Sequence, residues 1–421
     1  MRAQRTLPIL VVLALLLAAC GSENRQKGAL VASDLERVSA DAPAADIAAV
    51  TAGGRAFAGE AYSRMTSASE GNLVFSPSSI RLALAMAYAG ARSETAAQMK
   101  QVLRFDLDDA RLHAAMNALD QALTARNRDK VVLSIANALW GQQGLGFSPG
   151  FLDLLARDYG AGMRVVDYKS AAEQARKSIN DWVAGETNGR ITDLISEGVL
   201  TDLTRLVLTN AVYLDATWAT PFDANSTGDG SFTLLDGSQV TAKMMFQEAG
   251  LSYAAGDGWQ AVELPYVGDE LAMLFVVPDS GLFSKVEGLA SDGLLDRVLA
   301  GLAPTKVRLT LPKFEFRSKT GMSDLLKSMG MIDAFDSGKA DFSGMTTAET
   351  LFISDAIHEA FISVDEAGTE AAAATAVVIG GDTAVPPDGI ELQLDRPFMF
   401  ALYDRATGEV LFLGRVLNPA G

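Results

Sequence analysis

The feature that most constrains this chain is a run of small, mostly uncharged residues near its carboxyl end. After the β-like segment 361–364, Gly368 leads into Thr-Glu-Ala-Ala-Ala-Ala-Thr-Ala-Val-Val at residues 369–378. A surface loop is ordinarily rich in Gly, Pro, Asn, Asp and Ser, whereas this run has almost no charge or bulk that would oppose burial in a sheet. The composition therefore favours a segment that can move from solvent into a neighbouring β-sheet.

Side chains along a β-strand alternate between its two faces, so an inserting segment has two phases. If Thr369 enters the interior of a sheet, the next residues of its phase are Ala371, Ala373, Thr375 and Val377, none of which is charged. Glu370 has the opposite phase, and we expect it to stay in solvent. The pattern favours an inserting segment over the alternative of a passive Ala-rich linker.

The rest of the chain indicates one large domain with helices first and strands later. Residues 45–419 contain no repeat and no linker-like stretch of Pro and Ser or of dense charge. Capping residues and apolar periodicity predict helices at 76–88, from 93 onward, at 108–127 and at 171–184. Strands are predicted at 131–140, 206–214, 240–246, 259–266, 271–277, 306–316, 352–366, 390–395, 398–404 and 410–416. This order favours an α+β fold, with N-terminal helices packed on large mixed or antiparallel sheets, over a doubly wound fold.

The chain is strongly acidic, with a net charge of −17. Removal of residues 1–19, which carry Arg2 and Arg5 and no acid, would lower the net charge to −19. Such a chain repels phosphate backbones and anionic glycans. We therefore expect no nucleic-acid partner and no polyanionic activator of the heparin type.

The amino terminus has the pattern of a secretory signal. Arg2 and Arg5 precede the apolar run 7–17, which is shorter than a membrane-spanning helix requires. Residues 17–20, Leu-Ala-Ala-Cys, resemble the lipobox of bacterial lipoproteins, which implies removal of residues 1–19 and acylation of Cys20. We expect an extracytoplasmic protein held by lipid alone to a bacterial membrane, in the periplasm, at the outer membrane or on the cell surface. A plain signal peptide with an incidental cysteine is the alternative.

The mature domain offers little to an enzyme. Cys20 is the single cysteine of the chain, so the domain has no thiol for catalysis, a zinc site or a disulfide. With two histidines and no phosphate-binding loop, we expect no metal and no cofactor. Residues 20–44 are polar and Ala-rich and are expected to form a flexible tether before a domain that spans residues 45–421.

Two short matches to enzyme motifs are rejected, and we expect no catalytic activity. Residues 146–150, Gly-Phe-Ser-Pro-Gly, fit the G-x-S-x-G nucleophile elbow, but that elbow uses the backbone N–H after the serine, and Pro149 has none. Residues 319–321, Lys-Thr-Gly, fit one box of the serine β-lactamases. Their S-x-x-K nucleophile is absent, because no Lys in the chain follows a Ser by three positions.

Several further motifs are spread along the chain. They are NLVFSPSSI at 72–80, SINDWV at 178–183, TNGRI at 187–191, LTNAVY at 208–213, LPKF at 311–314, RPFMF at 396–400 and GRVLNP at 414–419. With the run at 368–378, these segments resemble the serpins, protease inhibitors that insert their own reactive loop into a β-sheet. The resemblance covers roughly residues 43–419 and implies an exposed, mobile reactive loop at about 367–389.

The resemblance also implies roles for particular residues. The hinge of the loop would comprise Glu366, Gly368, Thr369, Glu370, Ala371, Ala372, Ala373, Ala374 and Thr375. A polar shutter cluster under the main sheet would comprise Ser76, Ser79, Asn210 and His358, whereas a lone histidine is otherwise more often a satisfied core residue. The breach, where the loop enters the sheet, would contain Trp218 and Lys313. Lys313 is expected to pair with Glu366.

By the same resemblance we expect a monomeric inhibitor that traps serine-type endopeptidases covalently. An elastase- or subtilisin-like serine protease, or a cysteine protease, would attack the loop. Counting from Glu366 as in the family places the scissile bond at Asp382-Thr383, but counting back from Pro397 lands near Pro386. The window Ile379 to Val385 therefore stays open. The alternative is a non-inhibitory serpin-fold binding protein on the cell surface.

Overall fold

Two β-sheets form the framework of the protein, and the computed structural model describes residues 28–369 and 389–421. Within them, the seven strands of sheet A lie in the order β1 (Ala29–Val31), β4 (Met163–Val166), β3 (Val131–Gln142), β5 (Leu206–Thr217), β13 (Gly368–Thr369), β12 (Ile353–Val364) and β11 (Phe314–Gly321). Sheet B has nine strands; its main path is β14 (Ile390–Gln393), β10 (Ala303–Pro312), β7 (Gln239–Gly256), β8 (Trp259–Pro265), β9 (Leu271–Pro278), β15 (Phe398–Asp404), β16 (Val410–Val416) and β2 (Leu73–Phe75). The ninth strand, β6 (Gly228–Thr233), pairs with β7.

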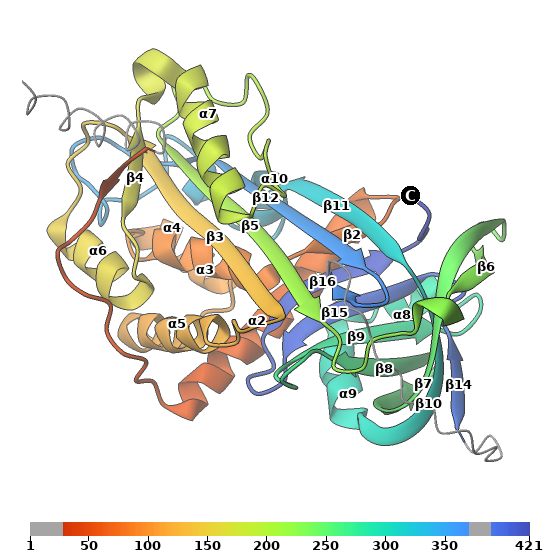
Figure 1. Ribbon diagram of the computed structural model, residues 1–421. Helices are drawn as coiled ribbons and strands as arrows, with labels where there is room; N and C mark the ends of the chain where they lie inside the picture. The colour runs from red at the N-terminus through yellow and green to blue at the C-terminus, as the bar shows by residue number, and fades with distance from the viewer. Residues whose placement is uncertain (1–27, 370–388) are drawn as a thin grey trace, which may run out of the picture.

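Helices cover these sheets, and the longer ones come early in the chain (Figure 1). They are α2 (Ala44–Ala68), α3 (Pro77–Tyr88), α4 (Ser93–Val102), α5 (Asp109–Thr124), α6 (Pro149–Leu154), α7 (Tyr168–Glu186), α8 (Phe283–Glu287), α9 (Leu294–Gly301) and α10 (Met322–Ser328). Short turns of other helix types lie at η1 (Leu155–Tyr159), η2 (Ala224–Ser226), η3 (Ala290–Asp292) and η4 (Asp333–Phe335). The α3 helix begins as its sequence predicts, because Ser76 Oγ accepts from the backbone N–H of Ser79 and Pro77 occupies the first turn.

Sheet A is buried on both faces along β5. The side chains of Leu208 and Val212 belong to the main core, which α3 also enters. Those of Val207 and Ala211 point the other way and pack in a second cluster with Ile179 of α7. A strand buried on both faces reads as a mostly apolar run, which is why residues 206–214 stand out in the sequence despite Thr209 and Asn210 in their middle.

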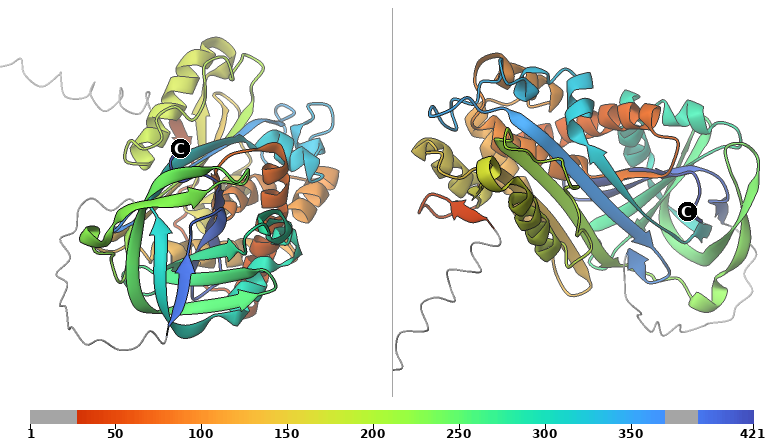
Figure 2. Two further views of the ribbon diagram at one scale, coloured as in Figure 1. Left: turned by 90° about the vertical axis from the view of Figure 1, so that its right-hand side faces the viewer. Right: turned by 90° about the horizontal axis from the view of Figure 1, so that it is seen from above.

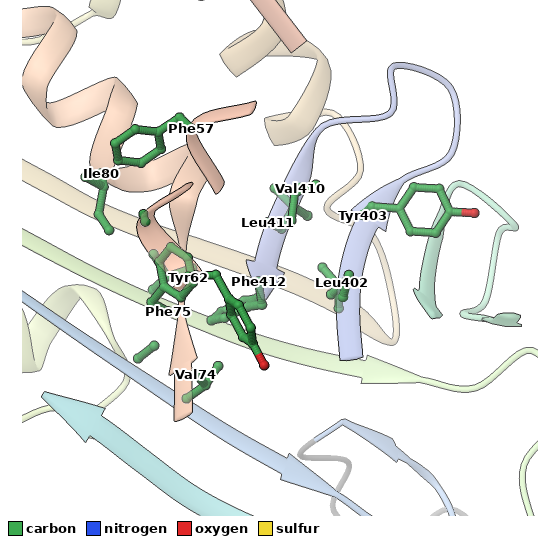
Figure 3. Packing of buried hydrophobic residues seen from close by; sticks show 14 of the residues in the cluster. Phe57, Tyr62, Val74, Phe75, Ile80, Leu402, Tyr403, Val410, Leu411 and Phe412 are labelled. Atoms are coloured by element: carbon green, nitrogen blue, oxygen red, sulfur yellow. The ribbon is translucent and has the colours of Figure 1, made fainter. Parts of the chain in front are cut away.

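The main core joins the early helices to sheet B. Figure 3 shows Phe57 and Tyr62 of α2 with Phe75 of β2 and Phe412 of β16, all of which are almost fully buried. The hydroxyl of Tyr62 donates to Glu287 at 2.9 Å, so the buried phenol has a partner. The core between the early helices and sheet B is thus closely packed.

The strand predicted at 306–316 is wrong as a single element. The chain breaks at Lys313 into β10, which pairs with β7 of sheet B, and β11, which pairs with β12 of sheet A. Both halves have a strand-like pattern, and a sequence pattern does not show that the chain crosses from one sheet to another. Pro312 has no N–H to donate and marks the crossing.

The flexible tether expected at residues 20–44 is also corrected where the structure describes it. Residues 29–31 form β1, which pairs with β4. Arg37 then forms an ion pair with Asp120 of α5 at 2.7 Å and a hydrogen bond with Asn117 at 2.9 Å. Composition alone does not show that an open strand edge is present to bind such a segment. Residues 1–27, with the predicted signal and Cys20, lie outside the described residues.

The described residues offer neither a membrane-spanning helix nor a metal site. No helix among them has the length and apolarity needed to cross a bilayer. In the same part of the chain, no group of three or more His, Cys, Asp or Glu side chains is placed to hold a metal ion.

Candidate functional site

The predicted hinge begins at the place where β5 and β12 pair in the middle of sheet A, which we call the central joint. β5 and β12 pair in parallel from their first residues up to Val212 and Ala360. Beyond that point β13 lies between them, with Thr369 opposite both Ala216 of β5 and Val364 of β12. The first two residues of the run therefore already form a short strand, antiparallel to both neighbours, at one end of the joint (Figure 1).

A tight turn directs the chain into this position. Asp365 Oδ1 accepts from the N–H groups of Ala367 at 2.8 Å and Gly368 at 3.1 Å. The N–H of Asp365 donates to the carbonyl of Gly368 at 2.9 Å. Gly368 lies against β5 so closely that a Cβ would sit 1.9 Å from the carbonyl oxygen of Ala216. Glycine is required here because the backbone of the turn and that of β5 leave no room for a side chain.

Thr369 points into the protein, in the phase that the sequence indicates. Its side chain is buried, and its hydroxyl lies 2.5 Å from the hydroxyl of Tyr266. Tyr266 stacks on Trp218 with ring centroids 4.5 Å apart and planes 15° from parallel. Burial raises the pKa of Tyr266 well above its ordinary value, so the phenol remains a neutral hydrogen-bonding group. Thr369, the first hinge residue that points inward, is thus hydrogen bonded to the Tyr266 ring that stacks on Trp218.

The residues predicted for the breach converge on the same turn. Trp218 donates from its backbone N–H to Ala367 at 2.9 Å and from its indole to the carbonyl of Asp365 at 3.0 Å. Lys313 and Glu366 form an ion pair of 2.7 Å, and Thr227 donates to the other carboxylate oxygen at 2.8 Å. Burial alone would raise the pKa of Glu366, but the hydrogen bonds from Lys313 and Thr227 outweigh it and hold that pKa below its ordinary value.

The predicted shutter residues are brought together halfway along the joint. His358 Nε2 accepts from the backbone N–H of Ser76 at 3.0 Å. Its other nitrogen, Nδ1, therefore carries the proton of the neutral ring and donates to Asn210 Oδ1. Asn210 in turn donates to the hydroxyl of Ser79. Four residues from three segments far apart in sequence form one buried hydrogen-bonded cluster.

Asn137 is a member of this cluster that sequence reasoning missed. It pairs with Asn210 in the register of β3 and β5, accepts from the Asn210 amide and donates to the carbonyl of Ser79 at 3.2 Å. The signal was a polar amide in the middle of the apolar run 131–140, where a buried polar group must find partners. We define the shutter cluster from here on as Ser76, Ser79, Asn137, Asn210 and His358.

His358 is a neutral structural group in this cluster. The ring is fully buried, and desolvation lowers its pKa to about 3, although the hydrogen bond with Asn210 opposes that shift. A neutral imidazole that accepts on one side and donates on the other can join β12 to β5 and to the start of α3. The arrangement ties three elements together across the central joint.

The remaining predicted positions lie outside the described residues. These are the hinge residues Glu370, Ala371, Ala372, Ala373, Ala374 and Thr375, the scissile candidates Asp382 and Thr383 with the window Ile379 to Val385, and Cys20. The described chain resumes at Gly389. Its next strand, β14, pairs in parallel with β10 of sheet B.

Comparison with known proteins supports this arrangement. The model of the family described as "Serpin (serine protease inhibitor)" matches residues 52–419. An uncharacterized serpin-like protein of Thermococcus kodakarensis is 42% identical over 349 residues, which are 83% of this chain and 81% of that protein. The leukocyte elastase inhibitor of Xenopus laevis is 38% identical over 83% of this chain and 94% of its own length.

A solved structure agrees in fold. The native state of tengpin, a thermophilic serpin, superposes with a TM-score of 0.83 at 30% sequence identity, covering 93% of this chain and all of that one. The residues that the family model matches include the hinge, the shutter cluster and every described strand of the two sheets except β1. The chain belongs to the serpin family and has its single-domain α+β fold.

Proposed function

We propose that this protein inhibits serine-type endopeptidases by covalent trapping, with its own reactive loop inserting between β5 and β12. The observation that carries the proposal is the position of β13, which already lies in that joint and runs antiparallel to both neighbours. Continuing β13 would extend a strand that has begun, and would require β5 and β12 to part.

The length of the run matches the length of the joint. Gly368 lies opposite Thr217 and Thr369 opposite Ala216, so each further residue moves one position back along β5. In this register Ile379 would lie beside Leu206, the first residue of β5. β5 has 12 residues, the same number as residues 368–379. The predicted scissile window begins at Ile379, so the joint would be filled just as the cleaved end is reached.

The composition of the run suits both faces of the joint. Residues in the phase of Thr369 would enter the main core beside Val212 and Leu208. Those of the other phase, from Ala372 to Val378, would lie on the side of Val207 and Ala211, where α7 covers the sheet. Small side chains in both phases are required because neither face is open to solvent there, and this explains alanines at consecutive positions.

The register also gives the shutter cluster a role. Counted from Ala216 on one side and from Val364 on the other, Thr375 would lie beside both Asn210 and His358. Insertion breaks the hydrogen bond between those two side chains, and the hydroxyl of Thr375 can donate and accept in its place. The cluster would thus hold the joint shut and then accept the new strand.

Trapping depends on whether the cleaved loop inserts before the bond to the protease is hydrolysed. The protease serine Oγ attacks the carbonyl carbon of the scissile residue, the C–N bond breaks, and the new amino terminus leaves with a proton. The protease remains joined to the loop by an ester while the loop inserts. About ten added residues, at ~1 kcal/mol net per ladder hydrogen bond, favour insertion by on the order of 10 kcal/mol. The native state is then kinetically rather than thermodynamically stable, and the protease is caught if insertion outpaces hydrolysis.

The loop sequence favours proteases that cleave after small or apolar residues. Cleavage after Val378, Ile379 or Thr383 suits elastase- or subtilisin-like enzymes, whereas the family count to Asp382-Thr383 gives an acidic residue that few serine proteases accept. A cysteine protease attacking the same window would be held as a thioester. The similarity to a leukocyte elastase inhibitor supports a protease of the elastase type.

The amino-terminal pattern also indicates where the inhibitor is located in the cell. We propose that residues 1–19 are a signal removed on export and that acylated Cys20 anchors the inhibitor outside the cytoplasm of a bacterium. The support is the basic start, the short apolar run and the single cysteine at the lipobox position. The inhibitor would then act on proteases that reach the cell envelope.

One experiment tests the inhibitory function directly. The protein is mixed with a panel of elastase- and subtilisin-like proteases, and the products are analysed by denaturing gel and by mass spectrometry. We expect an SDS-stable adduct whose mass is that of the protease plus the N-terminal fragment of the cleaved inhibitor, less one water, and the mass of the released C-terminal peptide identifies the scissile bond. Cleaved inhibitor together with fully active protease, across the whole panel, would favour the alternative of a non-inhibitory binding protein.

A further inference from the structure

The N-terminal segment leaves sheet A at a defined point. β1 pairs antiparallel with the outer edge of β4, with Ala29 opposite Val165. The preceding residue, Gly28, has a φ of +71°, and a Cβ there would come within 2.7 Å of the Trp140 ring. Such close contact with β3 and β4 fixes Gly28, the first described residue, at this edge of sheet A.

That point lies at the end of sheet A where β5 and β12 begin. Val166 at the end of β4 is beside Gln142 at the end of β3. Gly141 pairs with Leu206, and Leu206 pairs with Ile353 at the start of β12. Figures 1 and 2 show β1, in red, and the arrowhead of β12, in blue, at opposite ends of the sheet. We call the end formed by Gly28, Gln142, Leu206 and Ile353 the far end, since β13 occupies the other one.

The far end is also where an inserted loop would finish. In the register set by β13, Ile379 would lie beside Leu206. Between the inserted strand and β1 lie β5, β3 and β4, and four strand spacings of ~4.8 Å amount to about 19 Å. A protease attached at or after Ile379 would have travelled about 40 Å along the sheet, at ~3.3 Å per residue, and would stop close to Gly28.

We propose that trapping carries the protease onto the membrane to which the inhibitor is anchored. This inference rests on the proposed loop insertion and on acylation of Cys20. Residues 21–28 can span at most about 29 Å when fully extended. A protease domain of ~240 residues is about 45 Å across, so it cannot hang between an upright inhibitor and the bilayer. The inhibitor must tilt, and the captured protease must lie against the lipid surface.

The far end has side chains that suit a lipid surface. Leu203, three residues before β5, is 70% exposed and is the most exposed large apolar side chain in the described part of the chain. Val199 in the same connection is 40% exposed, and Leu30 of β1 is 58% exposed. Apolar side chains that would be unfavourable in water are favourable at the boundary between headgroups and acyl chains.

Förster resonance energy transfer from the protease to labelled lipid vesicles tests the proposal. The full-length lipidated protein is reconstituted in phosphatidylethanolamine and phosphatidylglycerol vesicles with an acceptor dye on the headgroups, and the protease carries a donor dye. Active protease, which becomes trapped, is compared with a variant whose catalytic serine is replaced by alanine and which can only dock on the intact loop. We expect transfer at least twofold more efficient for the trapped protease. Equal or lower transfer after trapping would overturn the proposal.

Three controls separate the causes of a negative result. Lack of an SDS-stable adduct refutes the proposed inhibition, and lack of vesicle binding refutes the anchor; either removes the basis of this inference and is recognised by its own readout. Inserting thirty Gly and Ser residues before Gly28 adds a flexible reach of about 30 Å, so the difference in transfer should shrink. Leu203→Ser should lower transfer from the trapped protease, whereas Ile332→Ser, at another exposed site, should leave it unchanged.

Discussion

Asn210 of β5 and His358 of β12 face each other across the central joint of sheet A, and their side chains are hydrogen bonded. Both side chains are buried, so parting the two strands leaves the Nδ1–H of His358 and the Oδ1 of Asn210 without the partner that each has in the other. An unsatisfied buried polar group costs ~1–3 kcal/mol, which opposes opening of the sheet until a replacement arrives. The joint is therefore held shut by polar groups at the place where a new strand would pass.

Thr375 is predicted to be that replacement. Thr375→Val keeps the shape of the side chain but removes the hydroxyl, so His358 Nδ1 and Asn210 Oδ1 would stay unsatisfied after insertion. At ~1–3 kcal/mol on the insertion step, we expect trapping to slow by about tenfold or more, with more inhibitor consumed as substrate. Thr375→Ser retains the hydroxyl and should trap nearly as well as the wild type. Equal stoichiometries of inhibition for Thr375→Val and the wild type would contradict the register proposed for the inserted loop.

Substitution of Thr369 tests which hinge side chains point into the protein when the loop inserts. Arginine there would have to be buried beside Tyr266, and an unpaired buried charge costs several kcal/mol. Since each ~1.4 kcal/mol changes a rate tenfold, Thr369→Arg should be cleaved at the same bond yet release active protease. Glu370→Arg, in the other phase, should be far milder. Rapid-quench measurement of adduct formation distinguishes the two, and undiminished trapping by Thr369→Arg would refute the assignment of the phases.

Acid should weaken the native state through His358. Burial lowers the pKa of His358 to about 3, whereas the unfolded chain has a value of ~6.5. Between these values the unfolded state binds more protons, so stability is full above pH ~6.5 and is lost as pH falls toward 3. Unfolding rates in urea measured from pH about 7.5 down to about 4.5 should rise, and the rise should be smaller in His358→Gln.

His113 supplies the matched control for that experiment. It is buried against Tyr159, and desolvation lowers its pKa to about 4, so it contributes with the same sign. His113→Gln should remove its own share of the pH dependence but leave the share of His358. A pH profile of His358→Gln that coincides with that of the wild type would mean that His358 is not held neutral.

Loop cleavage should stabilise the protein. A protease that cleaves the loop without being trapped leaves residues from Gly368 onward free to complete sheet A. The additional ladder bonds should raise the melting temperature well above that of the intact protein, as judged by calorimetry. Matching melting temperatures would show that the loop remains outside the sheet.

Cys20 is predicted to carry the anchor. Cys20→Ser removes the only thiol of the chain, so the protein should no longer incorporate labelled palmitate and should leave the detergent phase on partition. Inhibition in solution should be unchanged, because the anchor lies outside the inhibitory machinery. Palmitate uptake by the Ser variant would contradict acylation at this residue.

Much of this architecture could be read from local pattern. The long strand β5 is buried on both faces and appears as a mostly apolar run, and Ser76-Pro77 marks the start of α3 through its cap. The family motifs then indicated His358 and Asn210 as partners, and the structure places them in contact.

What the sequence did not show are relations between segments. The break at Lys313 depends on which sheet each half joins, and the docking of β1 depends on an open edge of β4 that is formed elsewhere in the chain. Asn137 was missed for the same reason, because its partner is supplied by the register between β3 and β5. Periodicity reports the environment of a residue but not the identity of its neighbours.

The docked strand β1 has a consequence for self-association. An exposed strand edge is a template for pairing with another chain, and a protein that carries an insertable strand is especially prone to linking copies in this way. Here β1 covers the edge of β4 with part of the same molecule. Between β5 and β12 the molecule's own loop has already begun to enter as β13, so a neighbour's loop would have to compete with it there.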